Sequence, residues 1–456
     1  MTFTLIAGDA FKLDTGNTAW MMTSAVIVLM MTVPALAFFY GGMVRGKSVL
    51  NMLMMNFIAA GTVGLIWILY GYSESFGSAT TGINQFFANP FQYFGLINLT
   101  DDKGLGAAVG VPALVGVAFQ STFAVITVAL ITGAIADRIK FSSWIAFTVI
   151  WATAVYFPLA HMVWGGGFLS PAGPIASWLS APIDFAGGTV VHIDAGIAGV
   201  VLALFLGRRK GWPKEQMRPH NVPFVLLGAA LLWFGWFGFN AGSALAANNL
   251  ASYAFVNTNT ATAAALAGWL IVEKLRDGKA TTLGAASGAV AGLVAITPCA
   301  GFISPLGSIV GGLLAGAVCA LAVAIKGRVR IDDSLDVGAV HLVGGIIGSL
   351  CVGLFSTLDT NSLGADGLFY GGGFGLLGKQ ALAVISVIAY SGTVTLIIAF
   401  LINLVIKFRV TEEVEADGLD VSLHGETAYE FTSNGNQPAF VQNSRPAAAD
   451  KEEVTA

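Results

Sequence analysis

Charged residues are scarce in this sequence. They make up 11% of its 456 residues, whereas 55% are hydrophobic. A soluble globular domain carries about 25% charged residues, so this composition excludes a soluble protein. The high apolar content also excludes a disordered chain. We therefore predict an all-α polytopic membrane protein.

Cysteine is also rare, and several motifs are missing. The three cysteines lie in apolar stretches, so no disulfide framework is expected. Residues 1–17 lack a basic segment followed by a short apolar one, which argues against a cleaved signal peptide. Without H-E-x-x-H or a cysteine ligand pair, a membrane-embedded hydrolase is disfavoured. The net charge of -4 is too small to indicate a nucleic-acid partner.

Long apolar stretches follow one another along most of the chain. A membrane-spanning helix needs about 20 apolar residues, and the sequence holds eleven candidates. The eighth is short and rich in small residues, and Asn248 and Asn249 mark the turn between the sixth and the seventh. The predicted spans are residues 19–42, 49–72, 111–136, 142–163, 188–207, 221–241, 253–272, 282–299, 305–325, 337–356 and 380–406.

Lys and Arg occur in alternate loops between these spans. One set of loops holds most of them, with the densest cluster between Arg208 and Arg218, whereas the opposite set holds only Lys12, Lys103 and Lys379. Cytoplasmic loops carry the excess of basic residues. The N-terminus is therefore predicted to be outside and the C-terminus inside.

This topology divides the chain into three regions. Residues 1–18 are expected to form an extracellular N-terminus, residues 19–410 an eleven-helix membrane domain, and residues 411–456 a cytoplasmic tail. Within the tail, residues 412–431 have apolar and aromatic positions and should dock under the membrane domain. Residues 432–456 lack such positions and are expected to be disordered.

A short pattern occurs twice in the membrane domain. Residues 191–199 and 340–348, in the fifth and tenth spans, both read V-H-x-x-(A/G)-G-I-x-G. Because a repeat of five spans is odd, its two copies must enter the membrane from opposite sides. We expect a five-plus-five inverted repeat, roughly 19–210 and 219–357, with an extra C-terminal helix at 380–406. Transporters of this architecture bind substrate near the membrane midplane.

The repeated pattern places His192 and His341 at equivalent positions inside the membrane. An ionisable residue in a span indicates a functional site by default, although a single buried histidine can also serve only helix packing. Asp184 precedes the fifth span by a few residues. We expect it to cap that helix or orient loop amides rather than to bind a ligand directly.

Aromatic residues form a second candidate set. Phe119 and Phe123 share one face of the third span because they are one helical turn apart. With Trp164 and the aromatics of the sixth span, they either belong to an interfacial aromatic belt or attract a small cation by cation–π contact. Ser243 would add a hydroxyl acceptor to such a cation site.

Several segments together resemble the ammonium transporter family (Amt/Mep, related to Rhesus proteins), and the chain is similar to a bacterial member over its whole length. These segments are Ala37 to Gly42, Phe119 to Phe123, Ala160 to Gly167, Asp184 to His192, Gly235 to Ser243, Asp333 to His341, and Gly418 to Tyr429 in the tail.

The resemblance implies roles for individual residues. It implies ammonium recruitment at Phe123, Trp164 and Ser243, with Asp184 as the acid that stabilises this region. It further implies a stacked gate of Phe119 and Phe123, a pore narrowed by Phe239, and twin pore histidines at His192 and His341. Contact with a PII-type signal protein would involve Gly418, Asp420, His424, Gly425, Glu426 and Tyr429. The resemblance also implies a homotrimer in the plasma membrane that needs no cofactor.

The expected activity is transport of ammonium or methylammonium, not enzyme catalysis. Ammonium would lose its proton at the outer site, and ammonia would cross an apolar pore along the histidines, with net transport of the cation. The alternatives are an ammonium sensor and a channel for neutral gas or solute with little cation flux. A rival from another class is a membrane haem protein in which the two histidines ligate a porphyrin.

Two stretches differ from the family pattern. Gly338, Ala339 and Leu342 surround His341, which predicts a pore floor that is wider at 338 and narrower at 339 and 342. Asp194 stands where the family more often has a neutral residue. Its carboxyl either changes the protonation of a pore histidine or faces another helix.

Overall fold

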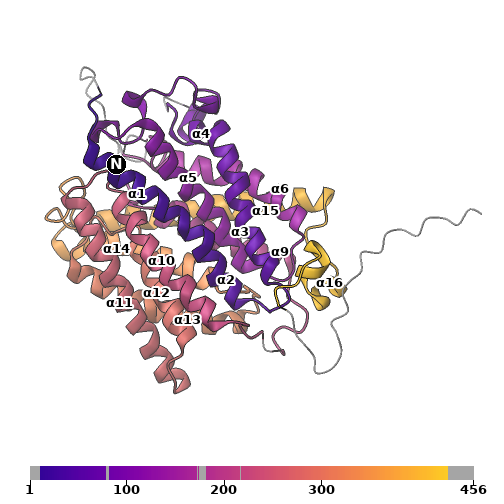
Figure 1. Ribbon diagram of the computed structural model, residues 1–456. Helices are drawn as coiled ribbons and strands as arrows, with labels where there is room; N and C mark the ends of the chain where they lie inside the picture. Colours follow the sequence, from indigo (N-terminus) through magenta and orange to yellow (C-terminus); the bar gives the residue numbers. More distant parts are fainter. Residues whose placement is uncertain (1–10, 79–81, 172, 174–180, 216, 430–456) are drawn as a thin grey trace, which may run out of the picture.

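The computed structural model describes residues 11–78, 82–171, 173, 181–215 and 217–429. The described residues form helices and contain no β-strand, which confirms the all-α prediction. In Figure 1, helices α1 to α3 and α5 occupy one part of the bundle and α10 to α14 another. The tail helix α16 lies at one end, beside the ends of α3 and α9. The predicted disorder of residues 432–456 and most of the predicted extracellular N-terminus lie outside the described residues.

Ten helical segments of the described chain are long and apolar enough to cross a membrane. They are Thr15–Met43, Val49–Phe76, Ala113–Ile135, Phe141–Val163, Gly188–Leu206, Val222–Gly242, Asn249–Asp277, Pro305–Val329, Gly338–Phe355 and Gly375–Val405. The eighth predicted span corresponds to α12 (Thr282–Ile296), which has only 15 residues. A helix of that length is too short to span a bilayer alone, so the number eleven stays a prediction.

Several of these segments are interrupted by a π-helical turn, in which the backbone carries an extra residue per turn. The segment Thr15–Met43 consists of α1 (Thr15–Met30), η1 (Met31–Leu36) and α2 (Ala37–Met43). The segment Val49–Phe76 consists of α3 (Val49–Ile66), η2 (Trp67–Gly71) and α4 (Tyr72–Phe76). The segment Phe141–Val163 consists of α6 (Phe141–Trp151), η8 (Ala152–Tyr156) and α7 (Phe157–Val163). The segment Gly188–Leu206 begins with η9 (Gly188–Ile193) and continues as α9 (Asp194–Leu206). The segment Gly338–Phe355 begins with η10 (Gly338–Leu342) and continues as α14 (Val343–Phe355). π-Helical turns are frequent at functional sites.

The remaining spans are regular helices. They are α5 (Ala113–Leu130), which ends in the 3₁₀ turn η7 (Ile131–Ile135), α10 (Val222–Gly242), α11 (Asn249–Asp277), α13 (Pro305–Val329) and α15 (Gly375–Val405). Three of them, α10, α11 and α13, start at a residue whose polar side chain caps the helix. The Asn248 side chain accepts a hydrogen bond from Ala251 N at 3.0 Å and starts α11, so the predicted turn at Asn248 is confirmed. Such a cap satisfies a backbone N–H that the helix leaves free.

The tail begins after α15 and turns back under the bundle. It contains α16 (Glu412–Asp417) and the π-helical turn η12 (Asp420–His424). Among the described residues, η12 packs against α3. The predicted docking of the first part of the tail is therefore seen as a contact with the membrane domain.

Candidate functional site

The two repeated histidines meet inside the bundle. His192 lies in η9 and His341 in η10, and both side chains are buried. Their Nδ1 atoms are 3.3 Å apart, and their ring centroids are 5.4 Å apart at an interplanar angle of 23°. One neutral ring can donate to the other at this distance, so the pair can share a proton. A porphyrin plane does not fit between rings in direct contact, which disfavours the haem reading.

Aromatic rings line this histidine pair. Trp236 stacks on His192 with a centroid distance of 5.4 Å, and Phe239 lies 6.2 Å from the same ring. The Tyr40 hydroxyl is 3.5 Å from His341 Nε2. His192 Nε2 has no hydrogen-bond partner within the described part of the chain. Sequence reasoning did not assign Tyr40 to the pore, because it is more than 300 residues away from His341 and follows no spacing rule.

A stacked pair of phenyl rings lies beyond the histidines. Phe123 of α5 stacks on Phe239 of α10, with centroids 4.0 Å apart and an angle of 17°. Phe119 is 4.9 Å from Phe123 but tilted by 59°, so among the three predicted gate residues the face-to-face pair is Phe123 with Phe239 and not Phe119 with Phe123.

The predicted recruitment residues gather outside this stack. Trp164 meets Phe123 edge-on at 6.3 Å, and its indole N–H donates to the Asp184 backbone carbonyl at 3.0 Å. The Ser243 hydroxyl donates to Phe239 O at 2.8 Å, which leaves its oxygen lone pairs free to accept. A cavity of about 40 Å³ lies here. Its described lining is Phe76, Leu105, Gln120, Phe123, Trp164, Phe185, Ser243 and Leu245.

Asp184 directs its carboxylate at the backbone. Its Oδ1 accepts from Gly187 N at 2.8 Å and from Gly188 N at 2.7 Å, and its Oδ2 accepts from Thr189 N at 2.8 Å. The Thr189 hydroxyl also donates to Oδ2. These amides are the orphan donors at the start of η9, and a negative charge there is favoured by the helix dipole. The side chain therefore acts as a cap, and the aromatic residues face the cavity.

Asp333 makes the matching arrangement before the second histidine. Its carboxylate accepts from Val337 N at 3.1 Å and from Gly338 N at 2.7 Å, at the start of η10. Burial raises the pKa of Asp333 to about 6, with Lys326 opposing that rise. Each acid precedes its histidine by the same number of residues. Asp333 belongs to one of the segments that resemble the family, but the sequence analysis predicts no role for it. The equal spacing between acid and histidine in the two copies could have identified it.

Asp194 is directed away from the histidine pair. It is fully buried, and its backbone carbonyl accepts a hydrogen bond from the Ser391 hydroxyl of α15 at 3.2 Å. Residues two apart on a helix do not face each other, so Asp194 and His192 project from different faces. Of the two alternatives open at this position, this placement favours the one in which Asp194 faces another helix.

The opposite end of α9 carries a buried network of charges. Arg209 Nη2 lies 2.8 Å from Asp332 Oδ1, and Arg138 Nη1 lies 3.2 Å from Asp332 Oδ2. Arg45 and Arg209 both reach Asp137, at 3.1 and 3.5 Å. Burial opposes ionisation of Asp332, but Arg209 and Arg138 hold its pKa below the usual value. Burial lowers the pKa of Arg138 to about 10, with Asp332 opposing the change.

The tail joins this network through Glu415. One carboxylate oxygen of Glu415 accepts from Lys210 N at 2.6 Å, and the other accepts from Arg409 Nη2 at 2.7 Å. The Arg45 guanidinium donates to the Glu415 carbonyl at 3.3 Å. Sequence reasoning missed Glu415, because nothing in an acidic tail distinguishes one buried glutamate.

The six tail residues predicted to contact a signal protein belong to the segment that packs against the membrane domain. Asp420 accepts from Leu50 N and Asn51 N at the start of α3, at 3.0 and 2.8 Å, and His424 Nε2 lies 3.0 Å from Asn51 Oδ1. The Tyr429 hydroxyl is 2.9 Å from His220 Nε2.

Gly418 has φ +109° and abuts Lys47, so a side chain there is strained and crowded. The remaining two are Gly425, at φ +69°, and Glu426, whose amide donates to Asp420 O.

Comparisons with known proteins show what the chain as a whole is similar to. The profile of the Ammonium Transporter Family matches residues 19–429. An ammonium transporter of Mycobacterium tuberculosis is 53% identical over 438 residues, which cover 92% of this chain and 91% of the relative. The crystal structure of Saccharomyces cerevisiae Mep2 has a TM-score of 0.78 at 34% identity and covers 88% of each chain. A structure of a sensor Amt protein has a TM-score of 0.80 at 29% identity, covering 89% of this chain and 98% of the other.

Proposed function

The chain belongs to the ammonium transporter family and transports ammonium, and from this premise we propose how its own residues perform the transport. Ammonium binds as a cation at Phe123, Trp164 and Ser243. It loses its proton before it passes the Phe123–Phe239 stack, and ammonia then moves along His192 and His341. The observation that carries this proposal is the 3.3 Å contact between the two histidines, directly beyond the aromatic stack.

The chemistry of the outer cavity supports binding of a weakly held cation. The resemblance includes Asp184 in the substrate site. Its carboxylate accepts hydrogen bonds from the amides of η9, so Asp184 stabilises the region indirectly. The cation is then recognised by the faces of the aromatic rings and by the Ser243 oxygen. Such a site binds without an ion pair, so it releases its ligand readily.

The histidine pair supports selectivity by proton loss. A full charge near the bilayer centre costs at least ~2.5 kcal/mol, and the lining around His192 is aromatic. Ammonium escapes this cost by leaving its proton behind, whereas potassium cannot. We propose that the proton also crosses, passed along the paired imidazoles, so that net transport is that of the cation.

The same premise extends to topology and assembly. We propose eleven spans with α12 as the short eighth one, a five-plus-five inverted repeat, the N-terminus outside and the C-terminus in the cytoplasm. The matching acid–histidine units of η9 and η10 support the repeat. We also propose a homotrimer in the plasma membrane, with one pore per subunit, on the strength of family membership. A reporter fused after Arg409 should be cytoplasmic, and an external signal would refute this orientation.

We propose that the docked tail is the contact point for a PII-type signal protein. The tail touches loops at the ends of several spans through Glu415, Asp420 and Tyr429, so a partner that pulls on it can reach the membrane domain. The similarity to a sensor Amt protein supports a link between such proteins and signalling.

Two signals measured in the same proteoliposomes test the transport proposal. Labelled methylammonium uptake reports flux, and ammonium-driven current reports charge movement. Uptake together with current supports net cation transport. Uptake without current would replace that step by passage of neutral ammonia, and binding without either signal would indicate a sensor.

A further inference from the structure

Two adjoining cavities of different size lie outside the aromatic stack. The smaller, of about 40 Å³, lies over Phe123. The larger, of about 220 Å³, extends away from it toward Leu363. Trp164, Phe185 and Ser243 line both cavities, so the two spaces meet at these side chains.

The two volumes suit ligands of different size. The smaller cavity has room for a molecule of the size of water or ammonium, since one water needs about 10–15 Å³ by this measure. The larger exceeds the roughly 150 Å³ of an apolar cavity that holds benzene. It therefore has more room than ammonium or methylammonium can use.

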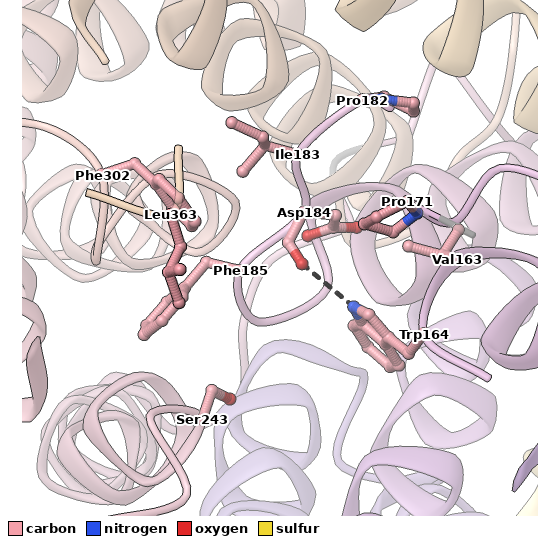
Figure 2. Close-up of a pocket in the computed structure, with 10 residues that line it drawn as sticks. All are labelled: Val163, Trp164, Pro171, Pro182, Ile183, Asp184, Phe185, Ser243, Phe302 and Leu363. Atoms are coloured by element: carbon pink, nitrogen blue, oxygen red, sulfur yellow. Dashed lines mark hydrogen bonds between the residues drawn. The ribbon is translucent and has the colours of Figure 1, made fainter. Parts of the chain in front are cut away.

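The part of the larger cavity beyond the shared residues, which we name the annex, is mainly apolar. Its described lining is Val163, Pro171, Pro182, Ile183, Phe302 and Leu363. In Figure 2, Phe302, Leu363 and Phe185 lie on one side and Trp164 on the other. Asp184 is the one charged residue of the described lining, and its carboxylate is occupied by the η9 amides.

We propose that the annex binds the alkyl chain of a primary alkylammonium ion of about four carbons, whose charged head takes the place of ammonium beside Trp164 and Ser243. This inference rests on the proposed recruitment of ammonium at those residues. The Phe123–Phe239 stack is buried and closed at 4.0 Å, so the longer ion is held outside and blocks transport by competition.

A series of alkylammonium ions tests the annex through inhibition of ammonium-driven current. Ethyl-, propyl-, butyl- and pentylammonium differ only in apolar length, and each added methylene should lower the half-inhibitory concentration about two- to fourfold. Butane-1,4-diammonium has the length of pentylammonium but ends in a second charge. It should inhibit at least about tenfold more weakly, because that charge would enter apolar surroundings.

One substitution should reverse this preference. Leu363 is 70% exposed, so Leu363→Glu should fold, and it adds a carboxylate to the annex. The variant should weaken the block by butylammonium roughly tenfold and strengthen that by the diammonium ion about threefold. Leu358→Glu makes the same change on the same loop, 45% exposed and outside the described lining, and should inhibit like the wild type.

The readouts separate this inference from the transport proposal. An ammonium-driven current in the wild-type vesicles shows that transport proceeds. In those same vesicles, a half-inhibitory concentration that does not depend on alkyl chain length would overturn the proposed binding in the annex but not the transport proposal. A Leu363→Glu variant that keeps the wild-type order of inhibitors would also overturn the proposed binding in the annex.

Discussion

The two ends of the span Gly188–Leu206 lie beside sites of opposite electrostatic character. At the end beside the outer cavity, which we name the vestibule end, the described lining is aromatic and aliphatic except for the Ser243 hydroxyl and the Gln120 amide. The carboxylate of the nearby Asp184 accepts hydrogen bonds from backbone amides. At the tail end, around Arg138 and Asp332, charged groups are paired with one another and buried. A site that must release a cation quickly benefits from weak contacts, whereas a site that fixes loops and a tail benefits from paired charges.

This comparison also explains where charge is tolerated. A buried ion pair is stable only when the remaining polar atoms are satisfied, and Asp332 meets this condition by accepting from Arg138, Arg209 and the Arg209 backbone N–H. An unpaired carboxylate in the vestibule would bind ammonium more tightly and slow its release. Asp184, Asp332 and Asp333 therefore lie where backbone amides or arginines bind their carboxylates.

Removal of Arg138 is expected to have the largest effect on stability. Arg138→Ala leaves Asp332 with one buried partner fewer and frees the carbonyls of Ala134 and Gly207. The free energy of unfolding should fall by about 3–5 kcal/mol, measured by thermal unfolding in detergent. Arg328→Ala removes an exposed arginine and should change it little. Equal stability of the two variants would show that the tail end does not depend on paired charge.

Substitution of Asp184 sharpens the contrast at the vestibule end. Asp184→Asn keeps the shape but loses acceptors for the η9 amides, so we expect a loss of about 2–3 kcal/mol in unfolding free energy. The amount of active transporter should fall, whereas the KM for ammonium in the remaining protein should stay within about twofold, since the carboxylate does not hold the ion. A large rise in KM at unchanged stability would make Asp184 a ligand.

The sequence predicted much of this arrangement, and its failures have physical causes. Apolar length placed ten spans, and the repeated V-H pattern found both histidines. The face-to-face contact of Phe123 with Phe239 could not be predicted, because helix periodicity relates residues of one helix and Phe239 stacks from α10. Tyr40 and Glu415 were missed for the same reason, since their partners are distant in sequence. Short-range spacing identifies which residues matter, and tertiary packing decides which of them touch.

Adjacent acids at the tail end should respond to pH with opposite sign. Burial raises the pKa of Asp333 to about 6, so its contribution to stability is present below the ordinary pKa and is lost as pH rises through about 6. Ion pairs lower the pKa of Asp332, so its contribution is lost only as the solution becomes strongly acidic. Relative to the wild type, Asp333→Asn should gain about 2 kcal/mol between pH 4 and pH 7. A difference that does not vary with pH would contradict this assignment.

Tail truncations are expected to give the smallest effects on transport itself. A chain ended after Thr432 keeps Glu415, Asp420 and Tyr429 and should transport and respond to a PII-type protein like the full chain. A chain ended at Val410 loses all three contacts and should alter regulation. Binding of the PII-type protein to both truncated chains is the measurement, and unchanged binding by the shorter one would refute a regulatory tail.

The central claim is that His192 and His341 form the conducting pair, and ammonium-driven current in planar lipid membranes tests it most directly. His192→Ala and His341→Ala should each reduce the current strongly, to below about one tenth of the wild type, because each removes a partner from the shared proton. An acidic replacement at either position should admit potassium, since a carboxylate offsets the cost of its charge. If both alanine variants carried wild-type currents, the histidines would be packing residues and the account would be wrong.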